Sequence, residues 1–175
     1  MTFISDSTDP LSNSYVTLAE VSAYIDFIDS ISGSGIKAKY DAFTQPVKEE
    51  LAMFATSLLD IYVDWYGVKT ISDSLLRWPR TGVVNLDGQL IDPDIYPQLL
   101  VKATLETINY VVSSKGFNPQ EISSLEQIKL STLMLKFNIN TESTEFNRFI
   151  VSIIGSLGVF LGGNGNQIVQ VDLQR

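Results

Sequence analysis

Apolar residues recur at helical spacing in several stretches of this chain. The first stretch opens with Thr17-Leu18-Ala19-Glu20, a capping-box pattern in which the Thr17 side chain accepts from a free backbone N–H group and Glu20 reaches back. Apolar residues then share one face as far as Ile28, and Gly33-Ser34-Gly35 ends the stretch. The pattern predicts an amphipathic helix.

Two further stretches predict longer helices. One begins near Pro46, which suits a first helical position because its missing N–H group would have no partner there, and its apolar stripe runs through Trp65 until Gly67. The other begins near Pro97 and ends before Gly116, and its wide apolar surface is typical of a helix that is covered on more than one side.

The connection between these two helices is long, roughly residues 68–95. Loops of this length are uncommon in compact domains and are often functional. The connection contains Trp78-Pro79-Arg80-Thr81-Gly82, the most distinctive stretch of the chain. It also contains Asp87-Gly88 between two apolar pairs, which predicts a tight hairpin turn.

The pattern changes after Gly116. Residues 126–139 alternate imperfectly and predict a strand or a short hairpin, and a last helix is predicted from about Thr144 with Leu157 on its apolar face. Residues 162–166 are rich in glycine and asparagine, and the final residues, 167–175, alternate as a strand does.

We therefore predict a mainly α fold, a small bundle of about four helices with a minor β element and an extended C-terminal strand or arm. Residues 1–13 would form an extended N-terminal arm. Residues 14–161 would form the helical domain, with the inserted loop 68–95 and the strand region 126–139. Residues 162–175 would form a glycine-rich hinge and a strand arm.

The composition excludes several classes of function. The 175 residues, 45% of them hydrophobic, suit one domain with a sizeable core. The chain has no cysteine and no histidine, which excludes disulfides, cysteine nucleophiles, Ser-His-Asp triads and the usual zinc sites. We expect no catalytic residues, no bound metal and no cofactor.

The net charge bears on which partners the protein could bind. The net charge is −8, and residues 1–114 carry all of it, with 15 Asp/Glu against 7 Lys/Arg. Such a body repels a phosphate backbone and disfavours sequence-independent DNA binding, although acidic residues along a DNA conduit would keep DNA from sticking. No stretch reaches the roughly 20 apolar residues of a membrane helix, and no signal peptide is visible. We expect a soluble, intracellular protein without a membrane partner.

Each candidate motif has a structural alternative. Trp78 could contact a partner, because Trp and Arg dominate protein interfaces, or it could fill a gap between helices while Arg80 pairs with a carboxylate. Asp60 and Asp64 could share a helix face as metal ligands would, but solvated surface explains them better. The many aromatic residues fit core packing better than a base-stacking platform.

Several motifs in one order carry a resemblance to a known family. They are Asn13-Ser14-Tyr15-Val16-Thr17-Leu18-Ala19-Glu20, Lys48-Glu49-Glu50-Leu51 followed by Ala55-Thr56, Trp78-Pro79-Arg80-Thr81-Gly82, and Pro97-Gln98-Leu99-Leu100-Val101-Lys102-Ala103. Together they resemble a phage family named for DnaT-like single-stranded-DNA-binding proteins, whose members look like head–tail connector, or head-completion, proteins. The resemblance covers residues 13–112 and is weaker beyond them.

The resemblance implies a structural adaptor in the virion neck, assembled in the host cytoplasm. Such a subunit would form a ring with neighbouring copies, commonly twelve, between the portal protein and the next neck or tail protein. Genomic DNA would pass through the ring without specific binding. The alternatives are a single-stranded-DNA-binding replication accessory protein, which the family name suggests, and a carboxylate–Mg²⁺ enzyme, for which the sequence offers only its acidic residues.

Partner contacts are expected in two places. One is the Trp-Pro-Arg-Thr-Gly stretch, and the other is the C-terminal strand, which could add to the sheet edge of a partner. The predicted partner-binding residues are Trp78, Pro79, Arg80, Thr81, Gly82, Ile168, Val169, Val171, Leu173 and Arg175.

Overall fold

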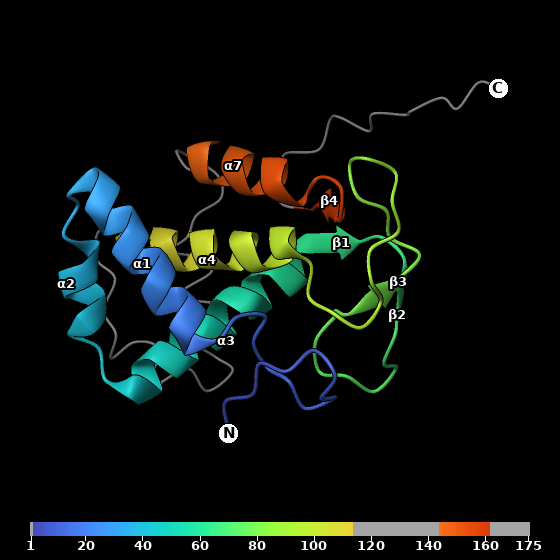
Figure 1. Ribbon diagram of the computed structural model, residues 1–175, viewed down its shortest axis with the longest axis horizontal. Coiled ribbons are helices and arrows are strands. Elements are labelled where there is room, and N and C mark those ends of the chain that lie inside the picture. The colour runs from blue at the N-terminus through green and yellow to red at the C-terminus, as the bar shows by residue number, and fades with distance from the viewer. Residues whose placement is uncertain (1, 114–143, 162–175) are drawn as a thin grey trace.

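The computed structural model describes residues 2–113 and 144–161, with the side chains of 144–147 left aside (Figure 1). The fold is mainly α with minor β structure, as the sequence predicts. The elements in chain order are α1 (Leu18–Ser32), α2 (Ile36–Asp41), α3 (Gln45–Tyr62), β1 (Val63–Trp65), β2 (Val68–Lys69), β3 (Arg80–Thr81), α4 (Gln98–Ser113), α7 (Thr144–Ile154) and β4 (Gly158–Phe160).

The predicted capping box is present at the start of α1. The Thr17 hydroxyl accepts a hydrogen bond from the Glu20 backbone N–H at 3.2 Å, and the Glu20 carboxylate accepts from the Thr17 N–H at 2.7 Å. Both bonds satisfy backbone donors that a helix start would otherwise leave free. The helix ends at Gly33, also as predicted.

The second predicted helix is shorter than the apolar spacing suggested. Helix α3 ends at Tyr62, and Trp65, which we placed on that helix, lies on strand β1 instead. Val63 and Trp65 are buried while Asp64 between them is exposed, which is the two-residue alternation of a strand. The prediction was wrong here because an apolar residue three or four positions after a helix can belong to either pattern.

Strand β1 pairs with a strand that the sequence did not reveal. The last described helix, α7, ends at Ile154, so Leu157, which we assigned to it, lies beyond its end. The chain then forms β4, which pairs antiparallel with β1, Val63 opposite Phe160 and Trp65 opposite Gly158. The short helix α2 was also not predicted, because six residues are too few to show a clear period.

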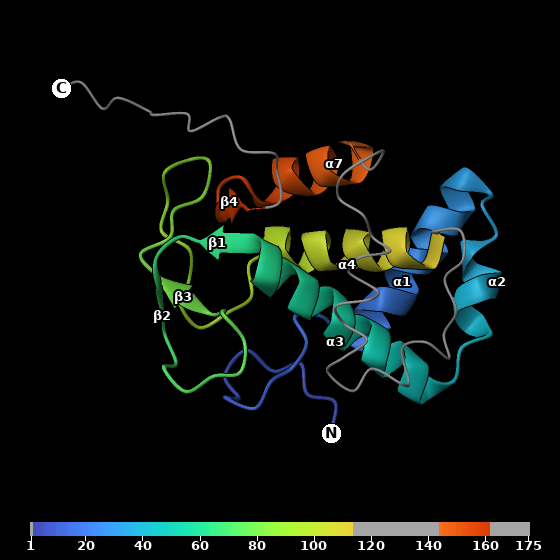
Figure 2. The same cartoon turned by 180° about the vertical axis from the view of Figure 1, so that it is seen from behind.

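Two clusters of buried residues form the core, and α4 contributes to both. Leu105, Ile108 and Val111 of α4 pack in a cluster with residues of α1, α2 and α3. Leu100 and Ala103, which lie nearer the start of α4, pack in a second cluster with residues of α7, β1 and the 68–95 connection. Helix α4 therefore runs through the centre of the described structure, with α7 on one side and α3 on the other (Figure 2).

The N-terminal arm is held against the helices without forming a helix or strand of its own over residues 2–13. The Asn13 side chain accepts from the Ile4 N–H at 3.0 Å and donates to the Thr2 carbonyl at 2.8 Å. The next residues are buried, and the Tyr15 N–H donates to the Thr56 hydroxyl of α3 at 3.1 Å. The arm thus places Tyr15 beside α3.

Three predicted segments lie outside the described residues: the strand region 126–139, the break at 162–166 and the final strand 167–175. Within residues 2–113 and 144–161, no helix is both long enough and apolar enough to cross a membrane.

Candidate functional site

The Trp-Pro-Arg-Thr-Gly stretch fixes the long connection to the core. Trp78 is 0% exposed and meets the Trp65 ring edge-to-face, with 5.9 Å between the ring centroids. Its peptide bond to Pro79 is cis, and the Pro79 carbonyl accepts from the Thr70 N–H at 3.0 Å. Of the two roles that the sequence allowed for Trp78, the structure therefore shows the packing role, since a fully buried ring has no surface to offer a partner.

Arg80 uses its guanidinium within the protein. Its side chain donates to the carbonyl oxygens of Tyr66 at 2.5 Å, Gly67 at 2.6 Å and Arg77 at 3.1 Å. We expected a carboxylate partner, but the acceptors are backbone carbonyls of the adjoining turn. These bonds hold β3 against the chain that follows β1. The remaining residues of the stretch, Thr81 and Gly82, are exposed, and a partner contact there stays a prediction.

Asp60 of α3 joins segments that lie far apart in the sequence. Its carboxylate accepts from the Tyr15 hydroxyl at 2.5 Å, the Trp65 indole N–H at 3.0 Å and the Arg77 backbone N–H at 3.1 Å. Burial raises the pKa of Asp60 above its ordinary value, while the three donors act in the opposite direction. This carboxylate therefore holds the N-terminal arm, α3, β1 and the connection together.

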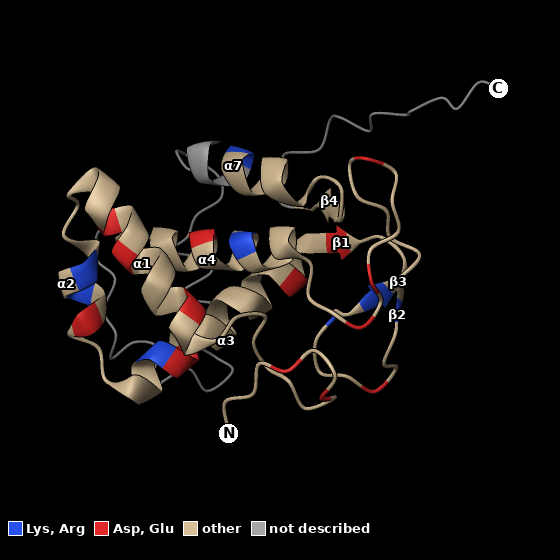
Figure 3. Ribbon diagram, viewed as in Figure 1, with Lys and Arg blue, Asp and Glu red and all other residues tan. Residues whose placement is uncertain are grey.

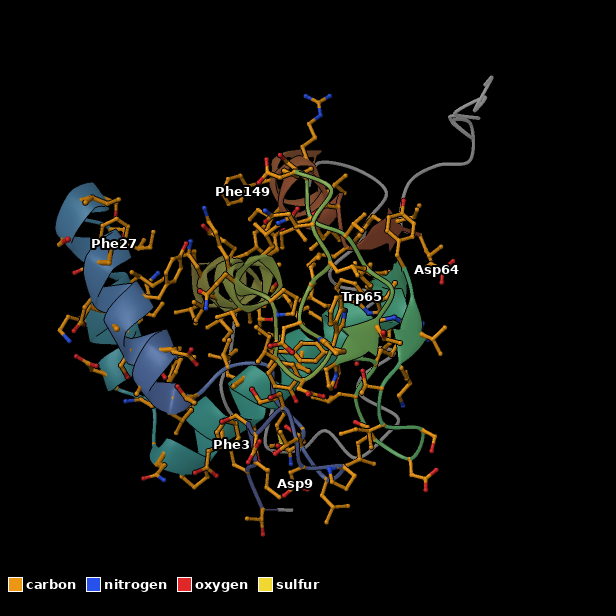
Figure 4. All side chains as sticks on the ribbon, turned by 45° about the vertical axis from the view of Figure 1, so that its right-hand side comes forward. Phe3, Asp9, Phe27, Asp64, Trp65 and Phe149 are labelled. Atoms are coloured by element: carbon orange, nitrogen blue, oxygen red, sulfur yellow. The ribbon has the colours of Figure 1, made fainter. Side chains whose placement is uncertain are left out.

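Asp60 and Asp64 do not share a helix face, and the solvated helix surface that we preferred for both residues does not describe Asp60. Asp64 lies on β1 and is exposed (Figure 4), whereas Asp60 is turned toward Tyr15, Trp65 and Arg77. The two residues do not share a helix face because α3 ends between them. In the described part of the chain, no three acidic residues gather as metal ligands would.

Residues 83–91 form a hairpin, as the Asp-Gly pair predicted; we call it the 83–91 hairpin. Val84 pairs with Leu90, and the Asn85 N–H donates to the Gln89 carbonyl at 2.8 Å. The Asn85 side-chain oxygen accepts from the N–H groups of Asp87 at 3.0 Å and Gln89 at 2.9 Å. These bonds give the turn a defined conformation without help from a partner.

The 83–91 hairpin buries its base and exposes apolar residues at its tip. Val83 is buried and its carbonyl accepts from the Ile91 N–H at 2.9 Å, which anchors the base in the core. Leu86 is 84% exposed and Leu90 is 75% exposed, and Val84 is exposed beside them. Three exposed apolar residues on one ordered hairpin are typical of a protein contact rather than of solvated surface.

Half of the eight Lys and Arg side chains in the described chain are engaged within it. Four of them are held by the protein's own groups: Lys37 by Asp26 and Asp41, Lys48 over the ring of Tyr40, Lys69 by the Ser74 carbonyl and Arg80 by three carbonyls. The other four, Lys39 of α2, Arg77, Lys102 of α4 and Arg148 of α7, are exposed, and none of them forms an ion pair with another described residue (Figure 3). These four cations lie on four different segments of the described chain.

The second predicted contact region cannot be placed. Ile168, Val169, Val171, Leu173 and Arg175 lie outside the described residues. Local sequence patterns could not reveal the hydrogen bonds of Asp60, because one of its partners lies 45 positions away. The Asp-Gly signal predicts a turn but not its burial, so the exposed tip of the 83–91 hairpin could not be recognised either.

Comparison with known proteins identifies a family. No curated protein and no solved structure is significantly similar to the chain. A family model matches residues 1–175, and its description names single-stranded DNA as the ligand of the family. The chain therefore belongs to the family described as "Putative DnaT-like ssDNA binding protein".

Proposed function

We propose that this protein is a non-enzymatic adaptor that works by binding other proteins in the neck of a tailed phage. The observation that carries the proposal is the 83–91 hairpin, which holds Val84, Leu86 and Leu90 exposed on a turn that the chain itself fixes. Exposing large apolar side chains on an ordered element costs solubility, so such a surface is typical of a protein-binding site.

Composition supports a role without catalysis. The chain has neither histidine nor cysteine, so neither a histidine general base nor a thiolate nucleophile is available. Burial raises the pKa of Tyr15 well above its ordinary value, and the hydroxyl keeps its proton and donates a hydrogen bond to Asp60. That pair serves packing between the arm and α3.

The finer assignment rests on the motif resemblance. It implies a ring of adaptor subunits, commonly twelve, placed between the portal and the next neck or tail protein. The acidic charge of residues 1–114 is compatible with a ring through which DNA passes without sticking. The family description does not mention such a ring and instead favours the second candidate below.

Capture of partners from infected cells tests the adaptor proposal. The protein would carry an affinity tag, and proteins that co-purify would be identified by mass spectrometry and compared with those of an untagged control. We expect portal and tail proteins as the main partners. Helicase, primase or polymerase as the main partners would contradict the adaptor and support the second candidate.

The second candidate is a single-stranded-DNA-binding accessory protein, and the family description is the observation that favours it. It predicts that the logarithm of the oligonucleotide-binding constant falls linearly with the logarithm of the salt concentration, because Lys and Arg side chains that bind phosphates displace the counterions of the DNA. Fluorescence anisotropy with a labelled oligothymidine measures this directly. The adaptor proposal expects no binding even at about 20 mM salt, where phosphate contacts are strongest.

A further inference from the structure

We propose that residues 167–171 fold back on this chain and pair antiparallel with β4, as a third strand of the β1–β4 sheet. The inference goes beyond the proposed function, because it concerns the protein before any partner is bound. A partner that takes the C-terminal strand would first have to displace it from β4. Capture of portal protein and pairing with β4 are measured in separate experiments, so either one can fail without the other.

The hydrogen bonds between β1 and β4 show which backbone groups of β4 are already used. The Leu161 N–H donates to the Tyr62 carbonyl at 2.7 Å, and the Tyr66 N–H donates to the Leu157 carbonyl at 2.9 Å. Bonded and non-bonded pairs alternate along an antiparallel ladder, so Val159, midway between Leu157 and Leu161, is also a residue that bonds to β1.

The edge of β4 that faces away from β1 is therefore open. Gly158 and Phe160, which alternate with Val159, direct their backbone N–H and C=O groups to this edge. Strand β1 is the only strand that pairs with β4 among residues 2–113 and 144–161 (Figure 1). Outside the β1–β4 ladder, none of these residues forms a backbone hydrogen bond with Gly158 or Phe160. Open strand edges pair readily with further strands.

The outer face of this sheet is apolar beside the open edge. Val159 and Leu161 are 49% and 59% exposed, and Tyr66, which follows β1, is 47% exposed. Asp64, opposite Val159, lies on the same face, whereas Trp65 is buried on the other face (Figure 4). The sheet thus leaves both backbone groups and apolar side chains available to a third strand.

The chain itself supplies a strand close to this edge. The described residues end at Leu161, directly after β4, and residues 162–166 are Gly-Gly-Asn-Gly-Asn. Glycine and asparagine adopt the left-handed conformations of tight turns, and a loop of this length is usual in hairpins. Residues 167–173 then alternate between apolar and polar as a strand does. So short a tether gives the segment an effective concentration of roughly millimolar, which a strand of another protein would have to exceed.

A hairpin loop at residues 162–166 also sets the register of the third strand. With this loop Ile168 lies opposite Phe160, and its backbone groups meet the open groups of that residue. Val169 then lies opposite Val159 and joins the exposed apolar face, as does Val171 two positions later. The sequence of residues 167–171 therefore matches both the open backbone groups and the apolar face.

A pair of introduced cysteines tests the pairing, since the chain has no cysteine of its own. Val159→Cys and Val169→Cys would be combined in one full-length chain at low protein concentration. Disulfide formation would be followed by thiol alkylation with intact-mass measurement and on a non-reducing gel. We expect the intramolecular disulfide to form about tenfold faster than in the matched control Val159→Cys/Gln170→Cys, because Gln170 would point to the opposite face.

Two results would overturn the inference. Equal rates for the two pairs of cysteines would show that the C-terminal segment has no fixed register beside β4. Disulfide-linked dimers in place of the intramolecular bond would show that the segment pairs with a second copy of the chain.

Hydrogen exchange followed by NMR gives an independent measurement on the protein without cysteines. The Phe160 N–H should be protected in the full chain and should exchange about tenfold faster after deletion of residues 163–175. The Val159 N–H is the internal control, because its bond to β1 remains in both proteins. The same exchange rate for Phe160 in both proteins would mean that no third strand covers the open edge.

Discussion

At the scale of single residues, Asp60 does more for this fold than its place on a helix surface would suggest. One carboxylate satisfies a phenol, an indole and a backbone N–H from three other segments. Buried donors that lose their acceptor cost more free energy than the hydrogen bond contributed, since water cannot replace it. The stability of the arm and of the connection is therefore coupled to this residue.

Replacement of Asp60 tests that coupling. We expect Asp60→Ala to lower the free energy of unfolding by about 2–4 kcal/mol, because three donors would lose their acceptor at once. Urea denaturation followed by tryptophan fluorescence measures the change. Asp64→Ala is the matched control, since Asp64 is exposed, and it should change stability by less than about 0.5 kcal/mol. Similar losses in both variants would show that Asp60 is not a centre of the fold.

The raised pKa of Asp60 also predicts a pH dependence. Burial raises this pKa above its ordinary value of 3.8, so the folded state holds the proton more tightly than the unfolded state. The stability that the folded state gains from this tighter proton binding is fully present below pH 3.8. It is lost as the pH rises through the pKa of Asp60 in the folded state. Unfolding free energies of the wild type and Asp60→Asn should therefore converge, or cross, as the pH rises through this window. A constant difference between the two proteins would contradict the prediction.

At the scale of elements, the turn after β1 is more constrained than the turn of the 83–91 hairpin. Gly67 has a φ of 71°, and a Cβ there would lie 2.3 Å from the Thr81 carbonyl oxygen. Gly88 has a similar φ of 77° but open space around it. A side chain at Gly88 would therefore meet backbone strain alone, whereas a side chain at Gly67 would meet the same strain and a steric collision.

Alanine at each glycine makes this separation measurable. We expect Gly88→Ala to lower stability by about 1 kcal/mol, the cost of a left-handed conformation for an L-residue. Gly67→Ala should cost clearly more, because β3 would have to move away from its partner strand β2. Thermal unfolding followed by circular dichroism would rank the two variants, and equal melting temperatures would show that β3 yields without cost.

Local signals explain what the sequence could predict. The capping box of α1 needs only Thr17 and Glu20, three residues apart, and the hairpin turn needs only residues 85–89, so both could be recognised from the sequence. The strand β1 and its partner β4 lie about 95 positions apart, and no local pattern encodes their pairing. For the same reason the sequence did not distinguish Trp65 on a strand from Trp65 on a helix.

Only part of the candidate site could be predicted from the sequence, for a related reason. The sequence drew attention to the Trp-Pro-Arg-Thr-Gly stretch because its residue types are rare together, but residue type does not reveal burial. The structure places Trp78 in the core and leaves the exposed apolar surface to the hairpin that follows it. A motif can therefore be important for building a contact surface without being part of that surface.

At the scale of the whole molecule, the sequence predicts a C-terminal strand arm that a glycine-rich break separates from the helical domain. Both buried clusters are made of residues between Tyr15 and Leu157. Deleting residues 163–175 should leave the melting temperature within a few degrees of that of the full chain, because the sequence predicts that they form an arm beyond the helical domain. If the C-terminal strand docks on the portal, the shortened protein should no longer capture portal protein from infected cells. A shortened protein that melts normally and still captures the portal would show that docking uses another surface.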